Sequence, residues 1–282
     1  ALPISGLIGD TIRVLGTPGA DIISLALNAS GHLLATVNGL TTTFTNFIGG
    51  PIAASTVERI AVDGGGGADQ LTVDSTNGAI PIFVSYDGGA DGDSLVLTGG
   101  TATSNVYSPG PNPGQGTSTA VIGGVTQTVS FSNIEPLVDL VAGPLTVNAT
   151  PADNAISYAQ TPGDPTRGRV TIDNFEYIDF SAKTTLTINA LGGSDTISLN
   201  NASTPTGLTG ITVNGGDPSG SDRLVVNGAA ATVSVTLDTQ TIAGATGAGG
   251  AVPVVFGAIE ELHVTAGAST TLSLSNTSGA NP

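Results

Sequence analysis

The chain is 282 residues long, with a formal net charge of −16, six Lys and Arg residues, and no Cys, Met or Trp. The missing cysteines exclude disulfides, thiolate metal sites and cysteine catalysis, and the negative charge disfavours nucleic acid and anionic lipid surfaces as partners. With 41 Gly and 10% charged residues, the composition is typical of short strands joined by tight turns. No apolar run is long enough for membrane insertion as a helix.

Strands with alternating apolar residues are expected to begin at an Asp or Asn that follows a Gly- or Pro-containing turn. The six occurrences start at Asp21, Asp69, Asp93, Asn154, Asp195 and Asp222. Further strands are expected over residues 57–62, 80–85, 186–189 and 211–214. Strand, turn and strand recur about every 25 residues, which fits one coil of a solenoid. The sequence therefore predicts an all-β fold, as a parallel β-helix or solenoid, with tandem β-sandwich domains as the alternative.

A longer repeat is superimposed on this short one. Ile12 and Val14 align with Leu145 and Val147 and again with Leu272 and Leu274. The pattern predicts two tandem units, residues 1–140 and 141–282, with a strand over 271–275 that opens a third unit. The third copy of this pattern stops at the point where the next strand would begin. We therefore expect a natural assembly point there. The Pro-rich stretch 107–119 is expected to protrude as a loop.

Catalysis is not expected from this chain. Its two histidines, His32 and His263, fall in different units and are both expected to face solvent. Most acidic residues recur at equivalent positions, which indicates architecture rather than chemistry. Glu58 and Glu176 share strand parity with apolar neighbours, so their carboxylates are expected to lean toward the core and to need N–H or cation partners there.

One turn has a motif that metal-binding repeats use. Gly64–Thr72 reads GGGGADQLT and resembles the hemolysin-type, or RTX, nonapeptide, and Gly88–Val96 is a near match. The resemblance implies calcium held by Asp and turn carbonyls of stacked coils. The candidate ligands form two pools, one of Asp69, Asp87, Asp91 and Asp93 and one of Asp195, Asp217 and Asp222. The alternative is that each Asp only accepts hydrogen bonds within its own turn.

The strand repeats as a whole resemble those of large bacterial surface and adhesin-like proteins, which implies an extracellular, structural or adhesive role. We expect a filament or surface-array subunit whose copies assemble head to tail through Ile12, Val14, Leu272 and Leu274. The alternatives are a fragment of a calcium-binding adhesin or surface-layer protein and, least favoured, a carbohydrate-active β-helix. Candidate glycan sites are Asn28, Asn148, Asn201 and Asn276 in sequons and Thr117 and Thr119 in the Pro-rich stretch.

Overall fold

The structure is a computed structural model that describes residues 7–8, 10–44, 57–217, 220–228, 232–249, 252–266 and 271–275. Within these ranges every regular element is a β-strand, as the sequence predicts, and 26 strands are formed. The described residues contain no helix that could cross a membrane.

The chain divides into two compact units by its internal contacts. The first comprises Ala1–Gly143 and Phe175–Ile178, and the second comprises Pro144–Asn174 and Asp179–Pro282. The boundary expected between residues 140 and 141 lies close to this division. The short segment Phe175–Ile178, which packs with the first unit, is not signalled by the sequence.

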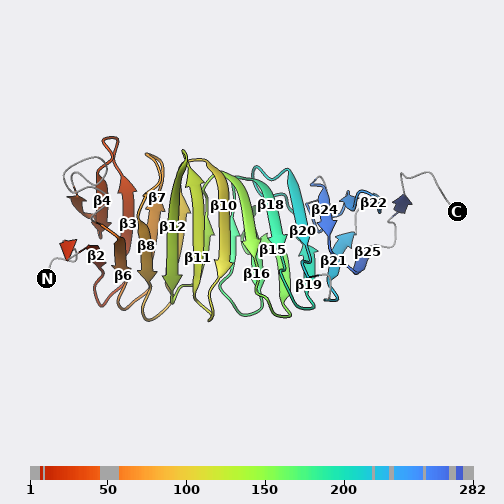
Figure 1. Ribbon diagram of the computed structural model, residues 1–282, viewed down its shortest axis with the longest axis horizontal. Helices are drawn as coiled ribbons and strands as arrows, with labels where there is room; N and C mark the ends of the chain where they lie inside the picture. Colours follow the sequence, from red (N-terminus) through yellow and green to blue (C-terminus); the bar gives the residue numbers. More distant parts are fainter. Residues whose placement is uncertain are drawn as a thin grey trace. The chain divides into compact units, whose positions relative to one another are not determined.

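Both units distribute their strands over two sheets (Figure 1). In the first unit, one sheet has the order β1-β2-β6-β8-β12-β11-β10 and the other has the order β13-β9-β7-β3-β4-β5. The strands are β1 (Leu7–Ile8), β2 (Thr11–Leu15), β3 (Ile22–Leu27), β4 (Leu33–Val37), β5 (Leu40–Phe44), β6 (Arg59–Asp63), β7 (Gln70–Asp74), β8 (Phe83–Asp87), β9 (Ser94–Thr98), β10 (Ala102–Pro109), β11 (Gly116–Ile122), β12 (Val125–Ser132) and β13 (Leu137–Asp139).

In the second unit, the corresponding orders are β14-β18-β20-β24-β23-β22-β26 and β25-β21-β19-β15-β16-β17. The strands are β14 (Gly143–Asn148), β15 (Ala155–Thr161), β16 (Asp164–Ile172), β17 (Ile178–Phe180), β18 (Lys183–Asn189), β19 (Thr196–Asn200), β20 (Gly210–Asn214), β21 (Arg223–Gly228), β22 (Thr232–Thr236), β23 (Thr241–Ala243), β24 (Val254–Gly257), β25 (Glu261–Ala266) and β26 (Thr271–Ser275).

The chain passes back and forth between the two sheets of a unit, so that successive strands of one sheet pair in parallel. In the first unit β2, β6, β8 and β12 form one such parallel series, and β3, β7, β9 and β13 form the other. Each coil therefore contributes one strand to each sheet, which is the solenoid arrangement that the short repeat predicts.

Antiparallel hairpins interrupt the parallel series at equivalent places in the two units. β3, β4 and β5 form consecutive hairpins, as do β10, β11 and β12, and β15–β16 and β22–β23–β24 occupy the matching places. Because β10 and β11 cover most of residues 107–119, the prediction of a protruding loop there is wrong. Only residues 110–115 form a turn, and the prolines fall inside it or at the end of a strand.

The long repeat reappears as a correspondence of strands. β2 matches β14, β6 matches β18, β8 matches β20, and β12 matches β24 by their order in the sheets. β26 follows β25 as β14 follows β13, and its bounds coincide with the strand predicted over 271–275. β26 therefore occupies the position of the first strand of a further repeat.

Alternate residues of each strand form the core. On β2, for example, Ile12 and Val14 are buried while Arg13 is exposed. Each fully buried Val, Ile or Leu stabilises the fold by roughly 1.5–3 kcal/mol. Two stacked aromatic pairs, Tyr107–Phe131 and Tyr158–Phe180, have ring centroids 6.4 and 6.2 Å apart, and each pair joins two strands that are separated by one intervening strand of the same sheet.

The two glutamates expected to lean inward differ. Glu176 is buried and only 2% exposed, whereas Glu58 is exposed. The parity argument is wrong for Glu58 because β6 begins at Arg59, so the residue lies in the turn before the strand, where alternation does not apply. His263 is exposed and contacts Glu261, as expected for a solvent-facing histidine, and His32 is partly exposed.

Candidate functional site

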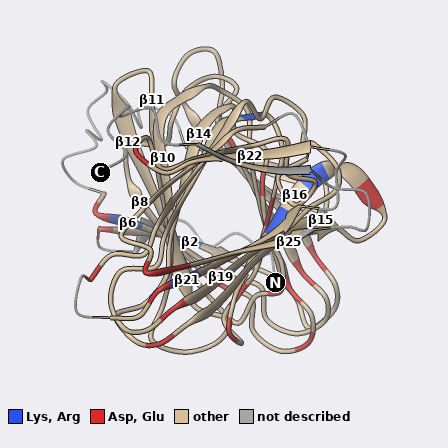
Figure 2. Cartoon of the chain, turned by 90° about the vertical axis from the view of Figure 1, so that its right-hand side faces the viewer, with Lys and Arg blue, Asp and Glu red and all other residues tan. Residues whose placement is uncertain are grey.

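The aspartates that directly precede strands β3, β7 and β9 are buried, and hydrogen bonds connect them from one coil to the next. Figure 2 shows that many acidic residues lie along turns between strands. In the first unit, the backbone N–H of Asp21 donates to Asp69 Oδ1 at 2.7 Å, and the N–H of Asp69 donates to Asp93 Oδ1 at 2.7 Å. All three side chains are at most 1% exposed. We call this series, with its counterpart in the second unit, the aspartate ladder.

The second unit repeats the ladder with one change of residue type. The N–H of Asn154 donates to Asp195 Oδ1 at 2.7 Å, and the N–H of Asp195 donates to Asp222 Oδ1 at 2.9 Å. The N–H of Asp222 then donates to Glu260 Oε2 at 2.7 Å. The ladder arises because each Asp is the residue before a strand, where its N–H would otherwise lack a partner from the neighbouring coil.

The first rung of each unit is fixed by a residue from the adjoining hairpin. In the first unit, the Asn38 side-chain amide donates to Asp21 Oδ1, and Asn38 Oδ1 accepts the N–H of Ile22. In the second unit, Asn154 Nδ2 donates to Asp173 Oδ2 at 2.7 Å, and Asp173 Oδ1 accepts the N–H of Ala155. Each pair contains one acid and one amide.

The second carboxylate oxygen of most rungs has no hydrogen-bond partner. This is true of Oδ2 in Asp69, Asp93, Asp195 and Asp222 within the described residues. A glycine makes room for it: a Cβ on Gly64 would lie 2.5 Å from Asp69 Oδ2 and 2.4 Å from the carbonyl oxygen of Gly88. The oxygen therefore lies in a cradle that only glycine leaves open.

Burial without a full set of donors favours the protonated form of these carboxyls. Burial raises the pKa of Asp69 and that of Asp195 from 3.8 to about 6, and the hydrogen bond from the preceding rung's N–H offsets part of the rise. Burial also raises the pKa of Asp93. The neighbouring rung's negative charge acts in the same direction on Asp69 and Asp195.

The remaining candidate calcium ligands lie outside the ladder. Asp87 Oδ1 accepts from Asn133 Nδ2 at 2.7 Å, Asp91 Oδ2 accepts the N–H of Gly67 at 3.1 Å, and Asp217 is exposed. The part of the chain that the structure describes holds no group of three or more His, Cys, Asp or Glu placed for a metal ion. The pools expected from the spacing are therefore not assembled among these residues: Asp69 and Asp93 are buried in the ladder, whereas Asp87 and Asp91 are exposed. Calcium binding stays a prediction.

The predicted assembly residues lie on corresponding strands. Ile12 and Val14 on β2 are 2% and 0% exposed. Leu272 and Leu274 belong to β26, which pairs in parallel with β22 so that Leu272 is opposite Val233 and Leu274 is opposite Val235. The side chains of these two leucines lie outside the described part of the structure.

The candidate glycan sites differ in accessibility. Asn201 is 0% exposed, and its Oδ1 accepts from the N–H and hydroxyl of Ser203, so the prediction is wrong for this residue. Asn28 and Asn148 are half-buried, and Asn276 lies outside the described residues. Thr117 and Thr119 are half-buried on β11 rather than on a protruding loop.

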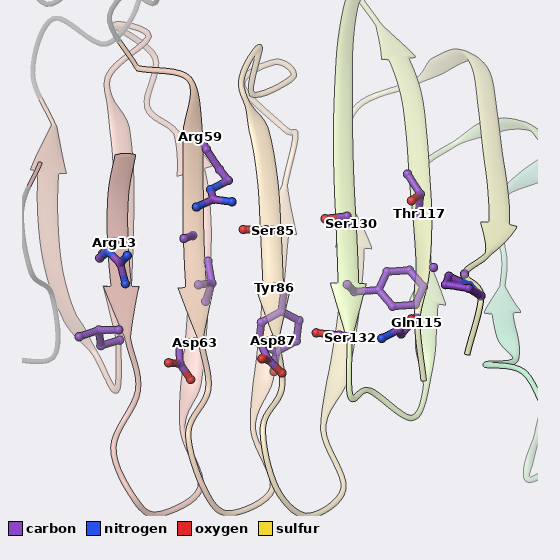
Figure 3. Close-up of a pocket in the computed structure, with 17 residues that line it drawn as sticks. Arg13, Arg59, Asp63, Ser85, Tyr86, Asp87, Gln115, Thr117, Ser130 and Ser132 are labelled. Atoms are coloured by element: carbon purple, nitrogen blue, oxygen red, sulfur yellow. The ribbon is translucent and has the colours of Figure 1, made fainter. Parts of the chain in front are cut away.

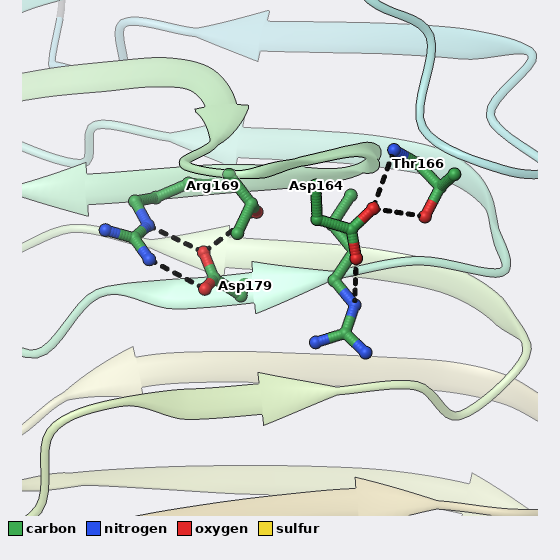
Figure 4. A network of polar contacts seen from close by, with 6 residues as sticks. Asp164, Thr166, Arg169 and Asp179 are labelled. Atoms are coloured by element: carbon green, nitrogen blue, oxygen red, sulfur yellow. Dashed lines mark hydrogen bonds and ion pairs between the residues drawn. The ribbon is translucent and has the colours of Figure 1, made fainter.

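Two polar arrangements have no clear signal in the sequence. One is an ion pair in the second unit, where Asp179 accepts from Arg169 Nε at 2.6 Å and Nη2 at 2.7 Å and from the Thr161 hydroxyl at 3.1 Å (Figure 4). The other is a groove beside Arg13 and Arg59 in the first unit. For the ion pair, the sequence offers one indication, which is the single acid inside the apolar run YIDF.

Comparison with known proteins gives no relative for this chain. No family model matches it, no curated protein matches it, and no solved structure matches its fold. The roles assigned to its residues therefore rest on geometry and chemistry alone.

Proposed function

We propose that this chain is a structural subunit of an extracellular filament or surface array, in which copies join head to tail through their outermost strands. The observation that carries the proposal is the place of β26. It repeats the sequence pattern of β2, and it pairs in parallel with β22 along five residues. It thus acts as the first strand of a next repeat added to the last strand of the previous one.

The edges of the two units support this mode of assembly. β26 is the outermost strand of its sheet, and one of its edges has no strand partner among the described residues. Among the described residues, β2 is covered on its outer side only by the two residues of β1, which pair with Thr11 and Ile12. The rest of that edge of β2, from Arg13 to Leu15, presents backbone N–H and C=O groups to an added strand.

Pairing of β26 with β2 of a second copy would continue the parallel sheet from one molecule to the next. The alternating pattern of both strands would keep apolar residues on the core side. An interface of this kind joins two different surfaces, so it generates a filament unless the rotation closes a ring.

Electron microscopy and sedimentation of the purified chain test the proposal. Filaments or long oligomers are expected, and a variant that lacks residues 271–282 should remain monomeric. Monodisperse full-length monomers would contradict the proposal and favour a piece of a longer adhesin array.

Cross-linking tests the strand pairing itself, because the chain has no cysteine of its own. In-register addition of β26 to β2 places Ser273 of one copy opposite Arg13 of the next. Ser273→Cys combined with Arg13→Cys should give intermolecular disulfides under mild oxidation. Ser273→Cys combined with Thr43→Cys, an exposed position on β5 of the other sheet, is the matched control. Equal cross-linking of both pairs would show that the contact is not the proposed one.

A further inference from the structure

A groove of about 440 Å³ lies on the outward face of the first unit, over β2, β6, β8 and β12 (Figure 3). The strand register explains the hollow. Ala61, Ser85 and Ser130 stand side by side in one outward row across three neighbouring strands, and their side chains are small. Larger groups surround that row, so a depression remains in the sheet surface.

The turn between β10 and β11 forms one wall of the groove and is held in place. The N–H of Gly110 donates to the carbonyl of Gln115 at 2.7 Å, and the Asn112 amide donates to Gln115 Oε1 at 3.2 Å. With Pro111 at the rim, the turn has little freedom. The wall is therefore preformed, which lowers the entropy cost of binding.

Two arginines on the opposite side give the groove its chemical character. Arg13 and Arg59 come from adjacent strands and line the same hollow (Figure 3). Both are exposed, and neither guanidinium group has a hydrogen-bond or ion-pair partner among the residues the structure describes. The chain has only six basic residues against 22 acidic ones, so two unpaired guanidinium groups in one groove are not expected from composition.

Hydroxyl and carboxylate groups complete the lining. Ser85, Ser130 and Thr117 occupy the middle of the groove. Asp63 and Asp87 are next to each other at one end of it. They lie two residues further along their strands than the row of small side chains. Two residues of strand correspond to about 6.6 Å. The groove therefore offers cationic donors, hydroxyl groups and carboxylate acceptors in sequence, and the Cα atoms of Arg59 and Asp63, four residues apart on β6, are separated by about 13 Å.

We propose that this groove binds a sugar acid, as a uronate residue of an acidic oligosaccharide. The arginines hold the ring carboxylate, since a guanidinium forms two parallel hydrogen bonds with a carboxylate. The serine and threonine hydroxyls bond the ring hydroxyls, and Asp63 and Asp87 accept from hydroxyls of the next sugar of the oligosaccharide. A compact dianion such as sulfate is disfavoured relative to a uronate, because it brings two charges on one group close to the two aspartates, which repel it.

Isothermal titration calorimetry with oligogalacturonate tests the proposal, with the neutral galactose oligomer and free sulfate as comparison ligands. Binding of oligogalacturonate is expected, at least tenfold tighter than that of the neutral oligomer. Arg13→Gln and Arg59→Gln should each weaken it by about tenfold. The matched control is Arg167→Gln, which removes one partly exposed arginine of the second unit, paired there with Asp164, and should leave binding unchanged.

A second variant separates loss of charge from loss of space. Ser130→Tyr fills the hollow from an outward position that keeps both arginines, and it should abolish binding while circular dichroism shows a folded chain. Absence of binding by the folded wild type, equal loss with Arg167→Gln, or equal affinity for sulfate alone would overturn the proposal. Tighter binding of a free amino acid than of the uronate would also overturn it, because the arginines and aspartates would then recognise a zwitterion. Since these variants leave β26 unchanged, filament formation is scored separately.

Discussion

The aspartate ladder makes the stability of the chain depend on pH, and Asp69→Asn tests this directly. A carboxyl whose pKa is higher in the folded state binds more protons there than in the unfolded chain. Protonation therefore stabilises the fold, and the stability that it contributes falls as pH rises from about 4 through about 6 and is then constant. With folded pKa values of about 6 for Asp69 and Asp195, each residue should cost about 1.4 kcal/mol of unfolding free energy between pH 5 and pH 8.

Asparagine at position 69 keeps the oxygen that accepts the N–H of Asp21 and removes the titrating group. Asn154 already occupies an equivalent rung in the second unit, so the ladder tolerates an amide. We expect Asp69→Asn to raise the unfolding free energy at pH 8, by up to about 3 kcal/mol. At pH 5 the gain should be smaller by about 1.4 kcal/mol, because the wild-type carboxyl is then mostly protonated.

Urea unfolding followed by far-ultraviolet circular dichroism at pH 5, 6, 7 and 8 measures these differences. Asp10→Asn, at an exposed position, is the control for a simple change of net charge. If Asp69→Asn has the same pH dependence as the wild type, or the same effect as Asp10→Asn, the raised pKa does not describe this carboxyl.

Three further outcomes follow from the packing. Gly64→Ala should destabilise the first unit by roughly 2–4 kcal/mol in urea unfolding, because the added Cβ would lie 2.4 Å from a carbonyl oxygen. The control is Gly19→Ala, whose Cβ would meet nothing within 4 Å, and it should leave the stability unchanged. Arg169→Met should cost about 3–5 kcal/mol by leaving Asp179 buried without its partner, and a change under 1 kcal/mol in the same assay would show that the pair contributes little. Asn201 should remain without glycan when the chain is secreted from a glycosylating host, as intact mass and peptide mapping would report; occupancy at this site would contradict its burial.

The short repeat was sufficient to predict the parallel strands and the solenoid, because strand parity is a local property of the sequence. Asp21, Asp69 and Asp93 each precede a strand as predicted, and their mutual hydrogen bonds follow from stacking. The hairpins were harder to anticipate. Prolines suggested a long loop over 107–119, but Pro109 lies at the end of β10 and Pro111 and Pro113 fall in a short turn, where the missing N–H costs nothing.

The groove could not be predicted from the sequence for a different reason. Ala61, Ser85 and Ser130 are far apart in the chain and unremarkable one by one. Only the exact register of three strands places them in one row, and a shift of one residue would turn them toward the core. Arg13 and Arg59 are two of six basic residues in the sequence, and sequence spacing alone does not show that their strands are adjacent.

The acid and amide at the first rung have exchanged places between the two units: Asp21 meets Asn38, whereas Asn154 meets Asp173. If the units descend from one duplicated segment, one of them has undergone a double replacement that kept the contact complementary. Either single replacement would have set acid against acid or amide against amide. Recombination between the halves should therefore be tolerated outside residues 21–38 and 154–173 and penalised within them. Anyone shuffling or extending these repeats should transfer each pair intact.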